Sequence, residues 1–253
     1  FVNENTMAGL LNLGSLTSAG LFLTTKSAAT KRAIAIAAML CSSAVFMGNS
    51  RGGQLALIIG FFYFLVTSII NLRDKNGVNR HKARDIFGYG TLLLGGGLLV
   101  SLIAMQRWAG LSFERILTEP KFVPLYALPD ILEDFGWLGS GRGSFASIYP
   151  HYQPIDLNGF VTHPENIFVQ YLSEWGLGVG LASIAFGIGI LVDGLKKASK
   201  IDEPLKWGLW AGLVAVVVQQ LVDFGLESMG LALPMAAAMG LFFVDLKTGR
   251  RSV

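Results

Sequence analysis

The stretch Gly53–Leu72, GQLALIIGFFYFLVTSIINL, decides the fold, because it holds about twenty residues and none of them is charged. A helix of about 20 mostly apolar residues is long enough to cross the roughly 30 Å hydrocarbon core of a bilayer. The run Phe87–Met105 is also free of charge. A soluble protein with buried helices is the competing interpretation, but two such runs in one chain favour an integral membrane protein.

The composition of the whole chain agrees with this interpretation. Of the 253 residues, 52% are hydrophobic and 15% are charged, with a mean hydropathy of +0.53. Further stretches approach or reach the length of a span, and the 31 glycines suit close helix packing. We predict an all-α fold, a polytopic transmembrane helical bundle of about seven helices that forms a single integral-membrane domain over 1–253. The predicted spans are 7–23, 33–49, 53–71, 86–106, 165–192, 207–224 and 229–246.

The basic residues indicate how the spans are oriented. Most of the 20 Lys and Arg residues fall in segments 24–32, 72–85 and 193–206 and in the tail. These segments all lie on the same side of the membrane if the seven predicted spans cross it in turn. Positively charged loops stay in the cytoplasm, so the opposite ends of the spans are expected in the periplasm. The net charge of +3 and the pI of about 9.0 therefore indicate topology, and we predict a lipid bilayer and no nucleic acid as partner.

The connections between the spans suggest where function lies. Segment 107–164 is expected to be external and is much longer than a typical connecting loop, so we expect functional residues in it. With the tail inside and an odd number of spans, Phe1 lies outside, and we expect further helices before it. The chain has one cysteine, Cys41, so no intrachain disulfide forms and no cysteine-based metal site is expected.

Two of the external arginines lie among small residues. Arg51 belongs to Gly48–Gly53, and Arg142 belongs to Gly139–Ser144. A guanidinium binds phosphate through two parallel hydrogen bonds, and glycines let a large anion approach the backbone. Each site therefore predicts anion binding, although a snorkelling arginine beside a flexible turn explains either one equally well.

The segment Thr162–Asn166 opens the predicted fifth span. Thr162 and Glu165 have the spacing of a capping box, and a proline at position 164 suits a first helical turn. A helix starting here would offer free backbone N–H groups to a phosphate, with His163 beside it as an acid or base. The alternative is an interfacial histidine next to an ordinary cap. Within the spans, Glu174 and Asp223 are expected to have structural partners, such as an outer arginine.

Taken in order, these motifs resemble those of the O-antigen ligase and polymerase superfamily, which includes protein O-oligosaccharyltransferases. The resemblance covers nearly the whole chain. It is carried by Phe1–Asn5, Ser50–Gly53, Gly139–Phe145 with Tyr149–Tyr152, His163–Gly178 and Leu221–Phe224.

The resemblance implies a helical fold in the bacterial inner membrane with a large periplasmic loop. It also implies inverting, metal-independent glycosyl transfer from an undecaprenyl-diphosphate-linked glycan to a saccharide or lipid A-core acceptor, without a metal or nucleotide cofactor. A polysaccharide or lipid transporter and a non-catalytic scaffold of exopolysaccharide assembly remain as alternatives. A transporter would show broken helices repeated in two halves, and a scaffold would have no need of the outer arginines or of His163.

The resemblance also assigns roles to individual residues. Arg51 and an arginine of the long loop, Arg115 or Arg142, would bind the donor diphosphate. His163 would act on the acceptor hydroxyl or the leaving group. Many members of the superfamily have a second histidine where this chain has Glu165, so Glu165 is the alternative acid/base and His163 would then bind the diphosphate. The supporting residues are Asn166, Glu174 and Asp223.

Overall fold

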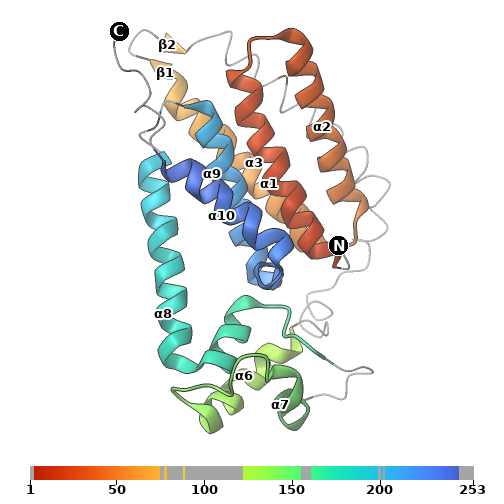
Figure 1. The fold of residues 1–253 in the computed structure, drawn as a ribbon, viewed down its shortest axis with the longest axis vertical. Coiled ribbons are helices and arrows are strands. Elements are labelled where there is room, and N and C mark those ends of the chain that lie inside the picture. The colour runs from red at the N-terminus through yellow and green to blue at the C-terminus, as the bar shows by residue number, and fades with distance from the viewer. Residues whose placement is uncertain are drawn as a thin grey trace. The chain divides into compact units, whose positions relative to one another are not determined.

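The computed structural model describes residues 3–74, 77–78, 88, 122–154, 161–198, 201 and 203–244, and most of them are helical. The elements are α1 (Glu4–Thr24), α2 (Ala28–Met47), α3 (Arg51–Leu72), β1 (Arg73–Asp74), β2 (Gly77–Val78), α6 (Val123–Phe135), α7 (Phe145–Tyr152), α8 (Ile167–Ala198), α9 (Pro204–Gln219), the 3-10 turns η1 (Gln220–Val222) and η2 (Gly225–Glu227), and α10 (Met229–Phe243) (Figure 1). The two strands form one antiparallel pair in which Arg73 faces Val78.

The chain divides into two compact units. The first unit comprises Phe1–Ala104, Asp193–Gln219 and Glu227–Val253, and the second comprises Met105–Val192 and Gln220–Leu226. Helix α8 contributes to both units. Of the predicted loop 107–164, the structure describes 122–154 and 161–164, where the chain forms the two short helices α6 and α7.

The helices agree with a multi-pass membrane protein. In the described part of the chain, five helices are long and apolar enough to cross a membrane, namely α1, α2, α3, α8 and α9 with its 3-10 extension. Helix α10 is apolar but shorter, with 15 residues. The predicted all-helical architecture is confirmed, whereas the predicted span 86–106 lies outside the described residues except for position 88. The count of about seven spans therefore stays a prediction.

The sixth predicted span, 207–224, agrees to within three residues with the span Pro204–Val222, but only part of it is α-helix. Regular helix ends at Gln219, and the chain continues as two 3-10 turns. The side chain of Gln220 accepts a hydrogen bond from Leu226 N at 3.0 Å, which stabilises a turn rather than a further helical repeat. A buried polar side chain thus ends a helix that the apolar pattern alone would continue.

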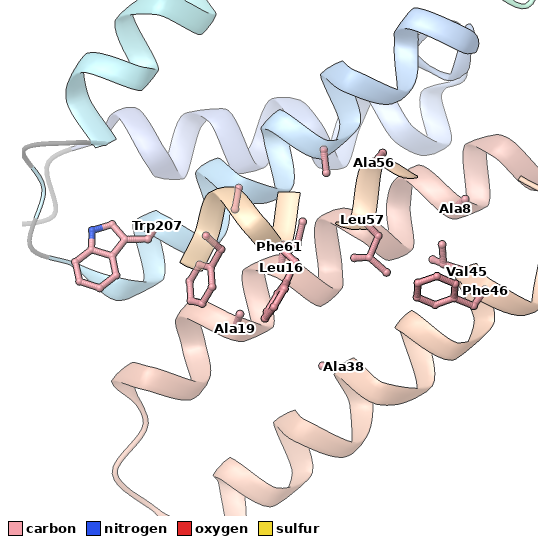
Figure 2. Close-up of a cluster of buried hydrophobic side chains, with 13 residues drawn as sticks. Ala8, Leu16, Ala19, Ala38, Val45, Phe46, Ala56, Leu57, Phe61 and Trp207 are labelled. Carbon is pink, nitrogen blue, oxygen red and sulfur yellow. The ribbon is translucent and has the colours of Figure 1, made fainter. Parts of the chain in front are cut away.

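The core of the first unit lies where α1, α2, α3 and α9 meet. Figure 2 shows Leu16, Leu57 and Phe61 packed among alanines of the neighbouring helices. Lipid tails are as apolar as leucine, so helices in a bilayer associate mainly through close packing. The cluster comprises Ala8, Leu16, Ala19, Ala38, Val45, Phe46, Ala56, Leu57, Phe61, Phe64, Trp207, Ala211 and Ala215.

Glycines bring the backbones of α1 and α9 into contact. A Cβ atom added at Gly20 would lie 2.3 Å from the carbonyl oxygen of Pro204, and one added at Gly208 would lie 2.5 Å from the carbonyl oxygen of Leu16. Neither carbonyl belongs to a flexible side chain that could move away. The two helices therefore pack at a distance that only glycine allows at these positions.

Two lysines hold the end of α10. Lys197 donates a hydrogen bond to Phe243 O at 2.9 Å, and Lys206 donates one to Val244 O at 2.8 Å. The last carbonyl groups of a helix have no partner within the helix and carry its negative dipole end, so an ammonium group stabilises them. Lys206 is buried and also lies 3.8 Å from Glu203. These contacts account for two of the basic residues of segment 193–206.

The glycine contact between α1 and α9 leads to a test of the fold. Gly20→Ala should destabilise the protein by about 1–3 kcal/mol, because the added methyl group forces the two backbones apart. Gly14→Ala is the matched control on the same helix, since a Cβ atom there meets nothing within 4 Å. The measurement is the temperature at which half of the detergent-solubilised protein is lost from the monodisperse peak. Equal temperatures for the two variants would contradict the packing described here.

Candidate functional site

Helix α8 is broken at Gly176. This residue has φ 69° and ψ −177°, a backbone conformation that is open to glycine and strained for any other residue. The helix therefore consists of two segments, 167–175 and 177–198, and it changes direction between them (Figure 1). The break also frees the backbone groups that would have bonded across it.

The loop that follows α6 forms hydrogen bonds with these freed groups. Ser140 N donates to Ser173 O at 2.9 Å, and Gly141 N donates to Glu174 O at 3.0 Å. In return, Leu177 N donates to Gly136 O at 3.2 Å, and Gly178 N donates to Trp137 O at 3.3 Å. Residues 136–141 thus replace the missing helical hydrogen bonds of α8 with bonds of their own, as a buried backbone requires. We call residues 136–144 the docked loop.

The contact between the docked loop and α8 is as close as two backbones allow. A Cβ atom added at Gly176 would lie 2.3 Å from Gly139 N, and one added at Gly139 would lie 2.3 Å from Gly176 N. Gly139 also has a positive φ of 71°. Glycine is therefore required on both sides of the contact, for space and for conformation.

The docked loop presents Arg142 at the surface. Arg142 is exposed and stands between Gly141 and Gly143, which both have positive φ. Its guanidinium carbon lies 5.5 Å from the centre of the Trp175 ring, a distance that allows a cation–π interaction. Trp175 in turn stacks on Tyr171 at 4.4 Å between ring centres. The backbone before Arg142 is thus held in place, while its charged group is exposed.

Glu174 holds the far end of the docked loop. Its side chain is 2% exposed, and its Oε1 atom accepts a hydrogen bond from Phe145 N at 3.2 Å, at the first turn of α7. The Ser144 side chain makes no cap hydrogen bond there, so the carboxylate of Glu174 takes that place. We expected an outer arginine as partner, but within the described residues Glu174 bonds to this amide and its Oε2 atom has no hydrogen-bond partner.

The predicted capping box at the start of α8 is wrong. Helix α8 begins at Ile167, and its cap is Asn166, whose Oδ1 atom accepts hydrogen bonds from Phe168 N at 2.9 Å and Val169 N at 3.1 Å. Glu165 cannot belong to the first turn because its φ is 47°, in the left-handed region. Because α8 begins at Ile167, no helix starts at Thr162–Glu165, and the anion site expected at such a start is not supported.

The segment around His163 contacts the segment that follows α9. The His163 ring stacks on Phe224 with 4.7 Å between ring centres, and Asn166 Nδ2 donates to Leu221 O at 2.7 Å. His163 is exposed. Asp223 is 1% exposed, and its Oδ1 atom accepts a hydrogen bond from Phe224 N at 2.8 Å. Asn166 and Asp223 therefore support the surroundings of His163.

Arg51 lies in the first unit, at the start of α3. The side chain is half-buried. Glu4 accepts two hydrogen bonds of 3.0 Å from Asn49, and Ser50 Oγ accepts one of 3.1 Å from Gly53 N. The structure does not place Arg51 relative to the second unit. Arg115 lies outside the described residues.

The helices α6 and α7 form a small core of their own beside α8. Phe145 and Tyr149 stack at 5.0 Å between ring centres and belong to a buried cluster with Ala127, Ile131 and Val169. Burial raises the pKa of Tyr149. Tyr152 donates a hydrogen bond to Asp134 at 2.5 Å, which raises the pKa of Tyr152 and ties α7 to α6. This core packs α6 and α7 against Val169 of α8 and so holds the segments on both sides of the docked loop.

Sequence reasoning missed three aromatic residues of the site. Trp175 lies under Arg142, Tyr171 stacks on Trp175, and Phe224 stacks on His163. The spacing of Tyr171 and Trp175, four residues apart in one helix, indicates that they share a face. Nothing in the sequence indicates that Phe224 contacts His163, because that contact joins segments far apart in the chain.

The described residues contain no group of three or more His, Cys, Asp and Glu side chains that could hold a metal ion. Comparison of the chain with protein-family models, with curated proteins and with solved structures gives no match.

The contact between Gly139 and Gly176 predicts the accessibility of Arg142 to trypsin. Gly176→Ala should release the docked loop and speed cleavage after Arg142 about tenfold, because overpacking costs about 1–3 kcal/mol and about 1.4 kcal/mol corresponds to a factor of ten. Gly178→Ala is the matched control, since a Cβ atom there makes an ordinary 3.4 Å contact. The measurement is the initial rate of this cut by mass spectrometry. A rate that does not differ between the two variants would contradict the docked arrangement.

Proposed function

We propose that this chain is a membrane glycosyltransferase of the O-antigen ligase or polymerase type. It transfers a glycan from an undecaprenyl-diphosphate-linked donor to a saccharide or lipid-core acceptor on the periplasmic side of the bacterial inner membrane. Two contacts within the second unit support the proposal, each between segments that lie far apart in the sequence. The docked loop bonds to the break of α8 at Gly176, and the His163–Asn166 segment contacts Leu221 and Phe224.

In this proposal, Arg142 binds the donor diphosphate. The docked loop holds the arginine in one place at the surface, so the guanidinium need not be ordered when the anion arrives. Negative charge grows on the diphosphate as the glycosidic bond breaks, and a fixed cation stabilises that charge more in the transition state than in the ground state. Arg51 is a second ligand of the diphosphate in the same proposal.

His163 is proposed as the base. The acceptor hydroxyl attacks the anomeric carbon, the bond from that carbon to the diphosphate oxygen breaks with inversion, and the imidazole takes the proton of the hydroxyl. The diphosphate leaves as an anion with the bonding electron pair. His163 is exposed and braced by Phe224, so it is available to an acceptor. Glu165 is the alternative base, since its side chain is half-buried and its backbone is held at φ 47°.

The test compares variants of the full protein in liposomes that contain undecaprenyl-diphosphate-linked glycan and an acceptor. His163→Ala should lower the transfer rate by about 100-fold or more while donor binding survives, as expected for loss of a general base. Arg142→Ala should weaken donor binding as well as transfer. His151→Ala and Arg32→Ala are matched controls, because both side chains are exposed and neither has a role in the proposal.

Three other outcomes would contradict parts of the proposal. Loss of transfer in Glu165→Ala with normal transfer in His163→Ala would make Glu165 the base. Transfer at the wild-type rate in both His163→Ala and Arg142→Ala would exclude this site. A wild-type protein that moves the lipid-linked glycan across the bilayer without joining it to any acceptor would be a transporter.

A further inference from the structure

The turn after α6 exposes two large apolar side chains. Trp137 is 70% exposed and Leu138 is 88% exposed, although both belong to the docked loop, whose backbone is firmly bonded. Exposure of so much apolar surface to water is unfavourable. A rigid turn that displays these two side chains together needs an apolar partner.

Helix α8 indicates what that partner is. Its second segment, 177–198, has about 22 residues and a length of about 33 Å, which is enough to cross the hydrocarbon core without the first segment. Apolar side chains along it are exposed, as expected where a helix faces lipid. The lysines at positions 196 and 197 mark one end of this segment, so residues 177–178 lie at the other surface of the bilayer. The exposed side chains include Val179, Leu181, Phe186, Ile188, Val192 and Leu195.

The exposed turn lies at that same surface. Trp137 O accepts the hydrogen bond from Gly178 N, so the turn is bonded to the first residues of the spanning segment. Tryptophan prefers the boundary between headgroups and hydrocarbon, where its ring is apolar and its N–H group is hydrated. We propose that Trp137 and Leu138 anchor the docked loop in the bilayer, inserting among phospholipids of the leaflet opposite the lysine-bearing end of α8.

The anchor would set the depth of Arg142. Gly141, the residue before it, is bonded to Glu174 O, so the arginine cannot lie far from the same surface. The guanidinium is then at the level of the lipid phosphates. If the proposed function holds, this is the level at which the diphosphate of a lipid-linked donor lies, and the anchor places Arg142 beside it. The anchor itself does not depend on that function.

The experiment measures membrane depth with a fluorophore at single cysteines. In a Cys41→Ser background, Leu138→Cys is labelled with the fluorophore NBD in nanodiscs of phosphatidylethanolamine and phosphatidylglycerol. Adding phosphatidylcholine that carries a doxyl quencher near the headgroup end of its acyl chain should lower the fluorescence by about half, because the side chain lies in the interface. Leu181→Cys is the lipid-facing control, and Glu133→Cys, exposed on α6, is the water-facing control.

The outcomes separate the anchor from the glycosyl transfer. Quenching at position 138 equal to that at 181 supports the anchor, whether or not the protein transfers glycan. Quenching no greater than at 133, with ready quenching by iodide in the water, would overturn it. If the labelled Leu138→Cys protein fails to fold, quenching of intrinsic fluorescence by brominated lipid is compared between wild type and Trp137→Phe. A smaller quenched fraction in Trp137→Phe supports the anchor, and an unchanged fraction overturns it.

Discussion

The second unit depends on one contact, the approach of the backbone at Gly139 to the backbone at Gly176. The left-handed φ of Gly176 interrupts α8, and the interruption leaves donors and acceptors that a buried segment must satisfy. Residues 136–141 satisfy them with four backbone hydrogen bonds, which form only because neither glycine has a side chain. Backbone groups that would have continued a helix instead hold a loop in place.

Other features of the unit follow from this contact. Arg142 is presented at the surface because the residues before it are bonded to α8, and the Glu174 side chain secures Phe145 just after it. Because α8 is interrupted, its second segment, 177–198, is by itself long enough to cross a bilayer. The break in α8 thus fixes the position of an exposed cation.

The sequence predicts the membrane helices well because each one depends on a local property, an uninterrupted apolar run such as Gly53–Leu72. The sequence pattern does not predict helix ends that are set by polar side chains bonding to backbone amides. Asn166, rather than Thr162 and Glu165, caps α8, and Gln220 turns the chain where 207–224 reads as one helix. The sequence motifs identify the candidate site residues, but they do not identify the residues that those side chains contact. The φ of Gly176 and the stacking of His163 on Phe224 depend on contacts between segments far apart in the chain.

The most direct test of the account is amide hydrogen exchange of the docked loop in nanodiscs, followed by mass spectrometry. The bonds from Ser140 N and Gly141 N to α8 predict that, within a peptide covering 136–141, these two amides exchange as slowly as the helices around them. They also predict that Gly176→Ala makes this peptide exchange rapidly while α1 and α9 stay protected. Rapid exchange of the peptide in the wild-type protein would contradict the account, because the loop would then not be docked.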